Sequence, residues 1–233
     1  MDAIMKLAVD YYLIDGVIGV LGLFGLALIF ERFKALFVTY SIDADAFMSK
    51  VIKLVEEDKV DEAITFCAAN ENKPLAYVAK RILERSDRDD AAIEQSLDIA
   101  AAEVAPGLTR NLGYLSMIAN VVTLVGLLGT VVGLIMSFKA VSFADPSQKQ
   151  SLLADGISLA MHATAAGLVV AIPVMICYSF LHARQGKIFG DIDRCSTRLI
   201  EALRNRDFGT FHAVAYPTAL NLDKKRTAPG KAV

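Results

Sequence analysis

Cysteine is scarce in this sequence, whose 233 residues include only Cys67, Cys177 and Cys195. None of them stands in a C-x-x-C spacing, the usual pattern of a small zinc site or a redox pair. They also fall far apart along the chain. The sequence therefore predicts neither a structural disulfide nor a metal site.

Catalytic motifs are missing as well. The sequence contains no H-E-x-x-H pair, no phosphate-binding loop and no G-x-S-x-G elbow, and its longest apolar runs hold no carboxylate. A formal net charge of −2 gives no general attraction to nucleic acid. We therefore expect no catalytic residues, no cofactor and no nucleic-acid partner, and we do not expect an enzyme.

Formal charge is absent from two long runs, residues 111–138 and 156–183, of 28 residues each. A membrane core of about 30 Å needs about 20 helical residues, so both runs are long enough to cross a lipid bilayer. A third run, residues 16–30, reaches spanning length if Tyr11 to Asp15 lie in the interface. With 55% hydrophobic residues, the sequence predicts three transmembrane helices, at 12–31, 112–138 and 156–182.

Lysine and arginine are distributed unevenly around these runs. Twenty-one of the 24 lie in residues 31–111 or after residue 182. The positive-inside rule places such segments in the cytoplasm. We therefore expect a cytoplasmic C-terminus, with the N-terminus and the 139–155 loop on the outer side.

The remaining segments have helical periodicity and no strand-period run, so the predicted fold is an all-α membrane protein. We expect a periplasmic amphipathic segment at 1–11, a helical cytoplasmic loop at 32–111, a cytoplasmic helix at 183–210 and a largely disordered tail at 211–233.

Helix signals divide the cytoplasmic loop further. Asp43 and Asp45 favour a helix start, a break is expected near Asp58, and NENKP (70–74) is a turn signal. A long helix then starts near Asp89, and it either kinks at Pro106 or runs straight into the second span.

Small and hydroxyl-bearing residues follow one side of the predicted helix 112–138. At 100° per residue they occupy about a quarter of the circumference. They are Ser116, Ala119, Thr123, Gly126, Thr130, Gly133 and Ser137, and Gly129 with Gly133 forms a G-x-x-x-G. This pattern predicts close helix packing, a narrow water-accessible pore lining, or both, since the two coexist in helical channels.

The helix 156–182 has a similar face, formed by Ala160, Thr164, Gly167 and Ala171. Pro173 removes a backbone donor there and can bend the helix. Ser158 and His162 lie on nearly the opposite face, so they form no cluster with Thr164. We interpret His162 either as a neutral packing residue or as a titrating group within the membrane.

Together these motifs resemble a known family. GLLGTVVG (126–133) and GISLAMHATAAGLVVAIP (156–173), after a first span that ends in ERFKAL, are similar to the ExbB/TolQ/MotA proton-channel family. The three-span layout resembles the ExbB/TolQ branch, because MotA-type stators have four spans.

The resemblance implies a homopentamer in the bacterial cytoplasmic (inner) membrane, whose second and third helices surround a pore. It further implies an ExbD/TolR-like partner with one span and a protonatable Asp, proton-driven rotation, and work on a TonB/TolA-like protein. By position, Thr130 and Thr164 would face the partner's Asp. Thr123 and Ser137 are further candidates for the channel lining, and the candidates for helix packing are Gly126, Gly129, Gly133, Gly167 and Pro173.

One position departs from the family pattern. Leu159 stands where members of the ExbB/TolQ branch usually carry Glu, so neither pore span has an acidic residue. Our hypothesis is that His162, one turn along, supplies a titrating group there. Three alternatives stay open: a non-conducting membrane scaffold, a stator of a gliding or flagellar-type motor, and sodium as the ion.

Overall fold

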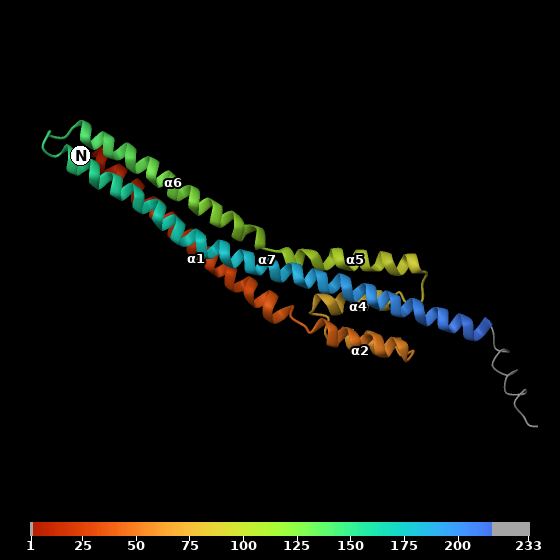
Figure 1. Ribbon diagram of the computed structural model, residues 1–233. Coiled ribbons are helices and arrows are strands. Elements are labelled where there is room, and N and C mark those ends of the chain that lie inside the picture. The colour runs from red at the N-terminus through yellow and green to blue at the C-terminus, as the bar shows by residue number, and fades with distance from the viewer. Residues whose placement is uncertain (1, 216–233) are drawn as a thin grey trace, which may run out of the picture. The chain divides into compact units, whose positions relative to one another are not determined.

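The computed structural model describes residues 2–215, with side chains from 13 to 206, and every regular element in this part of the chain is helical. The prediction of an all-α protein is confirmed. Figure 1 labels most of these elements. They are α1 (Asp2–Lys34), the π-helical turn η1 (Ala35–Thr39), α2 (Ala44–Glu56), α3 (Val60–Ala68), α4 (Pro74–Leu83), α5 (Asp90–Thr109), α6 (Leu112–Ser142) and α7 (Lys149–Ala215).

The chain forms two compact units. We call Met1–Thr39 with Gly107–Gly186 the membrane unit, and Tyr40–Pro106 with Lys187–Val233 the loop unit. Three helices of the described chain, α1, α6 and α7, include stretches long and apolar enough to cross a membrane. The predicted tail lies largely outside the described residues, because α7 continues to Ala215 and 216–233 are not described.

Two predicted boundaries in the membrane unit differ from the structure. Residues 2–11 do not form a separate helix: α1 runs from Asp2 to Lys34, and no proline interrupts this stretch. The long helix near the second span neither kinks at Pro106 nor runs straight on. It ends at Thr109, and Asn111 has a left-handed backbone (φ 59°) before α6 begins. Asparagine is among the few residues that adopt this conformation readily.

The helix α7 is a single element of 67 residues. It joins the predicted span 156–182 and the predicted helix 183–210 without a break. Pro173 lies inside it and does not end it. A proline in a long apolar helix is tolerated when the neighbouring turns and packed helices keep the rest of the backbone bonded.

In the membrane unit, α6 and α7 pack antiparallel. Gly126 lies against Thr164 and Gly167, Gly133 lies against Ala160, and Ser137 lies against Gly156. In contrast, α1 runs parallel to α7, since Gly22 faces Val170 and Gly25 faces Val174. Figure 1 shows the three helices side by side.

The outer faces of these helices are apolar. Val121, Leu128 and Ile135 of α6 are exposed, whereas Val125 and Val132 on the same side of the helix are half-buried. The other two helices likewise expose large apolar side chains, among them Leu23, Phe30, Val169, Ile172 and Phe180. Such continuous apolar exposure fits a surface covered by lipid or by other membrane helices.

The loop unit packs α2 to α5 around α7 beyond residue 187. The predicted break near Asp58 is confirmed, since α2 ends at Glu56 and α3 starts at Val60. The Asp43 carboxylate caps α2 by accepting the Ala46 N–H at 3.1 Å. Apolar side chains from all these helices are buried, including Met48, Val51, Val78, Ile82, Ile93, Leu199 and Leu203.

Arginines of α7 bind acidic residues on other helices of the loop unit. Arg194 and Arg198 lie 3.1 and 3.4 Å from the Asp45 carboxylate. Arg204 lies 2.9 Å from Asp90 and 3.3 Å from Glu94. Exposed pairs of this kind contribute little to stability, because water screens their charges.

Candidate functional site

The contact between α6 and α7 is made by residues that lack large side chains. A Cβ at Gly126 would lie 3.1 Å from the Ala163 carbonyl oxygen, and one at Gly133 would lie 2.8 Å from the Ala160 Cβ. A Cβ at Gly167 would lie 3.1 Å from the Val122 carbonyl oxygen. The two backbones therefore approach as closely as they do because these positions are glycine.

A hydrogen bond crosses this contact. The Thr164 hydroxyl of α7 donates to the Gly126 carbonyl of α6, with 3.0 Å between the two oxygens. Thr164 thus joins the two helices at the level where Gly126 and Gly167 lie against each other.

The other predicted lining residues bond within their own helix. Thr130 donates to the Leu127 carbonyl at 2.7 Å, and Thr123 donates to the Ala119 carbonyl at 2.9 Å. Thr130 is half-buried and Thr123 is exposed. Both hydroxyl oxygens keep free lone pairs on the surface of one chain, where another helix of an assembly can approach.

Ser137 has a different environment. Its hydroxyl donates to the Gly133 carbonyl at 2.7 Å, and its side chain is buried against Gly156. A side chain at Gly156 would overlap the Ser137 hydroxyl. Within one chain, Ser137 is therefore part of the packing contact, and its role in a channel lining stays a prediction.

Leu159 and His162 lie away from this contact. Leu159 is 46% exposed, and His162 is exposed as well. The separation of His162 and Ser158 from Thr164, predicted from the helical wheel, agrees with this exposure, since Thr164 faces α6. The structure of one chain brings no acidic side chain of α6 or α7 to this region.

A buried arginine is a feature that the sequence reasoning missed. Arg32, near the end of α1, is only 4% exposed. It donates to the Glu31 carboxylate at 2.8 Å and to the Gly107 carbonyl at 3.3 Å, and Asn111 donates to Glu31 at 3.1 Å. These bonds tie the end of α1 to the segment that precedes α6. The sequence suggested only that ERFK anchors the span at the interface.

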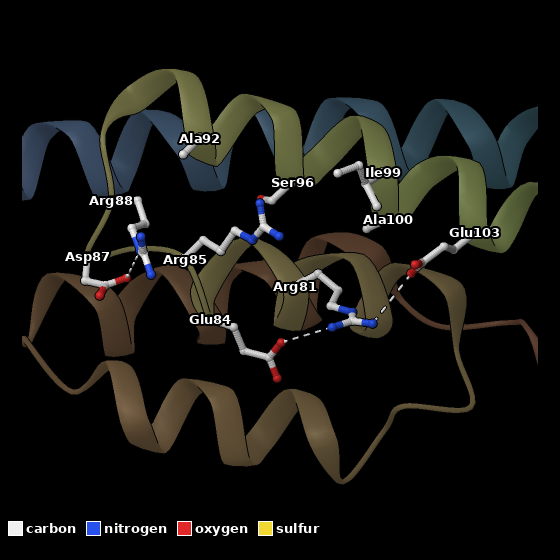
Figure 2. Close-up of a pocket in the computed structure, with 10 residues that line it drawn as sticks. All are labelled: Arg81, Glu84, Arg85, Asp87, Arg88, Ala92, Ser96, Ile99, Ala100 and Glu103. Carbon is white, nitrogen blue, oxygen red and sulfur yellow. Dashed lines mark ion pairs between the residues drawn. The ribbon is translucent and has the colours of Figure 1, made fainter.

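The loop unit has an open cleft of about 580 Å³ between α4 and α5. Figure 2 shows Arg81 between Glu84 and Glu103, with ion pairs of 3.6 and 3.7 Å. The positive and negative charges that line the cleft are equal in number. The positive residues are Arg81, Arg85 and Arg88, and the negative residues are Glu84, Asp87 and Glu103. The described residues include no cluster of His, Cys, Asp or Glu that could hold a metal ion.

Cys67, Cys177 and Cys195 are free thiols in the structure. Cys67 and Cys195 are buried in the loop unit. Burial raises the pKa of the Cys67 thiol to about 12. A thiol that stays protonated at neutral pH is neither a nucleophile nor a metal ligand.

These features define a helical membrane protein whose apolar helices pack through small residues and whose α6 and α7 are free of formal charge across their membrane segments. A family model described as the MotA/TolQ/ExbB proton channel family matches residues 70–194, more than half of the chain. The chain belongs to this family.

Several proteins of known name are similar to it. The putative biopolymer transport protein ExbB homolog of Methanothermobacter thermautotrophicus is 28% identical over 189 residues, 81% of this chain and 64% of that protein. The biopolymer transport protein exbB1 of Vibrio cholerae is 39% identical over 109 residues, 44% of this chain and 46% of that protein. The Tol-Pal system protein TolQ of Haemophilus influenzae is 31% identical over 115 residues, 49% and 50% of the two chains.

This chain therefore spans about half to two thirds of the length of these relatives. Among solved structures, a chain from the structure of C. jejuni MotAB matches with a TM-score of 0.59 at 17% identity. The match covers 86% of this chain and 83% of that chain. It supports the fold alone.

Proposed function

We propose that this chain is an ExbB/TolQ-type subunit of an ion-driven motor in the bacterial inner membrane. Five copies surround a central pore with their α6 and α7 helices, and an ExbD/TolR-like protein with one membrane span and a protonatable Asp occupies that pore. Protons that pass this Asp drive rotation, and the work reaches a TonB/TolA-like envelope protein. The N-terminus lies in the periplasm, and the loop unit lies in the cytoplasm.

The observation that carries this proposal is the neutral, hydroxyl-bearing surface of α6 and α7. Thr130 lies in the uncharged run between Arg110 and Lys139, and Thr164 lies in the uncharged run between Asp155 and Arg184. Hydroxyl groups can pass a proton or hydrogen-bond a carboxyl without holding a counter-charge that would trap it. The family to which the chain belongs is a family of proton channels.

Thr164 has a second task under this proposal. Its hydrogen goes to the Gly126 carbonyl, so its oxygen lone pairs are left as acceptors. A protonated Asp of the partner can donate to that oxygen, and a deprotonated Asp cannot. Thr164 would therefore distinguish the two protonation states of the partner while it holds α6 and α7 together.

The experiment is proton flux through the purified complex in lipid vesicles. The chain is co-expressed with an ExbD/TolR-like protein from the same genome, and internal pH is followed after a potassium diffusion potential is imposed. Replacing Thr130 or Thr164 with Val is expected to lower the proton flux by at least about tenfold, because the loss of a positioned proton-transfer group has an effect of at least this size. Ser179→Ala is the matched control, because Ser179 bonds only the Met175 carbonyl of its own helix, at 3.1 Å.

The alternatives have their own outcomes in this assay. Proton-tight vesicles with the wild-type complex would favour a non-conducting scaffold, and flux that follows a sodium gradient instead would favour sodium as the ion. The proposed titrating role of His162 is tested by His162→Leu, with His182→Leu as the control. If His162→Leu and His182→Leu both conduct protons like the wild type, the titrating role of His162 is wrong.

A further inference from the structure

A carboxylate oxygen is buried in the membrane unit without a partner. It is Oδ1 of Asp15 on α1, which has no hydrogen-bond donor among the described residues. Asp15 itself is half-buried. The sequence pattern alone suggested that Asp15 lies in the membrane interface.

Contacts of α1 set the depth of Asp15. The Cγ2 of the preceding residue, Ile14, lies 3.4 Å from the position of a Cβ at Gly129. Gly22 faces Val170 and Gly25 faces Val174, and the two helices run parallel. A residue of α1 therefore lies beside the residue of α7 whose number is about 148 higher. The same register places Asp15 level with Ala163, which itself contacts Gly129.

This level lies well inside the uncharged part of the neighbouring helices. On α6 the nearest charged residue toward the outer end is Lys139, which is 10 residues beyond Gly129, or about 15 Å of helix. On α7 it is Asp155, which precedes Ala163 by 8 residues, or about 12 Å. The formally charged residue nearest to Asp15 on α1 itself is Asp10, more than one turn away.

On α7 the titratable group at this depth is a histidine. His162 is adjacent to Ala163 and therefore level with Asp15. In α6 no titratable residue lies between Tyr114 and Lys139. Asp15 is thus the acidic residue that the fold brings to the level of Thr130 and Thr164.

We propose that Asp15 is a proton-binding carboxyl within the membrane, and that it supplies from α1 the acidic group that α7 lacks at Leu159. A buried carboxylate oxygen without a donor is costly while it is charged, and a bound proton removes this cost. The role in transport rests on the function proposed above. Leu159 lies four residues before Ala163, so the two positions differ in depth by about 6 Å.

A proton fits this site better than a metal ion. Sodium and divalent cations need several oxygen ligands at once. At this level Gly129 packs against Ile14 and Ala163, and none of these three side chains offers an oxygen. The described residues also include no group of three or more His, Cys, Asp or Glu side chains that could hold a metal ion.

The first experiment tests protonation independently of transport. The full-length chain is reconstituted in lipid and treated with dicyclohexylcarbodiimide, an apolar reagent that modifies protonated carboxyls in a membrane. Mass spectrometry of the peptides is expected to find Asp15 modified at neutral pH and Asp155 unmodified. Modification of neither residue, or of both equally, would overturn the proposal, because Asp15 would then be ionised or no different from a carboxylate at the helix end.

The second experiment tests the transport role in the complex with the ExbD/TolR-like protein. Asp15→Asn is expected to reduce proton flux by about tenfold or more, whereas Asp15→Glu keeps the flux and shifts its pH profile. Asp155→Asn is the control and is expected to conduct like the wild type. Each variant must elute as the same complex, so that loss of assembly is not mistaken for loss of flux.

The two proposals fail in different ways. If the wild-type complex conducts no protons, the proposed function is wrong, while carbodiimide labelling still decides whether Asp15 binds a proton. If the wild type conducts and Asp15→Asn conducts equally well, the proposed function stands and the role of Asp15 is wrong. A flux that follows sodium and is lost in Asp15→Asn would also overturn the proton-binding role.

Discussion

The Thr164 hydroxyl donates a hydrogen bond to the Gly126 carbonyl, across the contact between α7 and α6, with 3.0 Å between the oxygens. In a membrane, apolar side chains gain little by leaving lipid, so close backbone contact and interhelical hydrogen bonds must hold helices together. Gly126 takes part in both, because its missing side chain lets α7 approach and its carbonyl accepts the Thr164 hydrogen bond. This bond therefore links the packing of the two helices to the residue that we expect at the pore.

Thr164→Val tests the contribution of this bond to stability. The change keeps the shape of the side chain and removes the donor. We expect the free energy of unfolding to fall by about 0.5–2 kcal/mol, the range for interhelical hydrogen bonds in membranes. The measurement is titration of the purified chain from mild detergent into sodium dodecyl sulfate, followed by circular dichroism.

Thr130→Val is the matched control, since the Thr130 hydroxyl donates only to the Leu127 carbonyl of its own helix. Its effect on stability should be smaller than that of Thr164→Val. Equal effects would show that the bond to Gly126 contributes nothing of its own. Both variants are expected to lower proton flux, so only the stability measurement separates the two threonines.

Gly133→Ala tests the close approach of α6 and α7. The new methyl group would lie 2.8 Å from the Ala160 Cβ and 3.0 Å from its Cα, which forces the backbones apart. Overpacking of this kind costs about 1–3 kcal/mol. Gly19→Ala is the control, because nothing lies within 4 Å of a Cβ at Gly19, and it should leave stability unchanged or raise it. The same titration in detergent measures both, and a neutral Gly133→Ala would contradict the observed contact.

Arg32→Met tests the connection between α1 and the segment before α6. The variant keeps an apolar chain of similar length but leaves the Gly107 carbonyl without its donor and Glu31 without its ion pair. We expect a loss of about 1–3 kcal/mol, the usual cost of an unsatisfied buried group. Thermal unfolding of the purified protein in detergent gives the comparison. Lys34→Met, at an exposed position two residues on, should have little effect, and equal losses would argue against the buried contact.

Cys67 should resist thiol reagents in the folded protein. Its pKa is raised to about 12 by burial, so at pH 8 the thiol stays protonated and covered. A water-soluble maleimide is therefore expected to label Cys67 only after the loop unit unfolds, with mass spectrometry reading each cysteine separately. Labelling in denaturant provides the control. Rapid labelling of Cys67 under native conditions would mean that α3 opens readily.

Much of the helix pattern could be predicted from local chemistry. The break at Asp58 and the start of a helix after Asp43 follow from turn and capping residues, which act within a few positions. The end of α5 at Thr109 and the left-handed backbone at Asn111 were not predicted, because Pro106 is a stronger local signal than Asn111. The bonds from Asn111 to Glu31 and from Arg32 to Gly107 connect residues 80 and 75 positions apart, and no local pattern encodes them.

The candidate site was predictable in part. Helical periodicity placed Thr164 on the same face as Gly167 and placed His162 elsewhere, because one turn of helix fixes the angles between nearby residues. It could not separate packing from pore lining for Ser137, nor find the acceptor of Thr164 on another helix. The depth of Asp15 depends on how α1 slides along α6, which the sequence of α1 does not determine.

The sequence by itself determined that the chain is helical, that three stretches can cross a membrane, and that two of them carry hydroxyls without charge. These properties follow from composition and from the period of the helix. Only the tertiary structure decided which carbonyl Thr164 reaches, that Arg32 is buried, and that Asp15 lies level with Ala163. Those relationships depend on the register between helices, which is set by contacts between residues far apart in the chain.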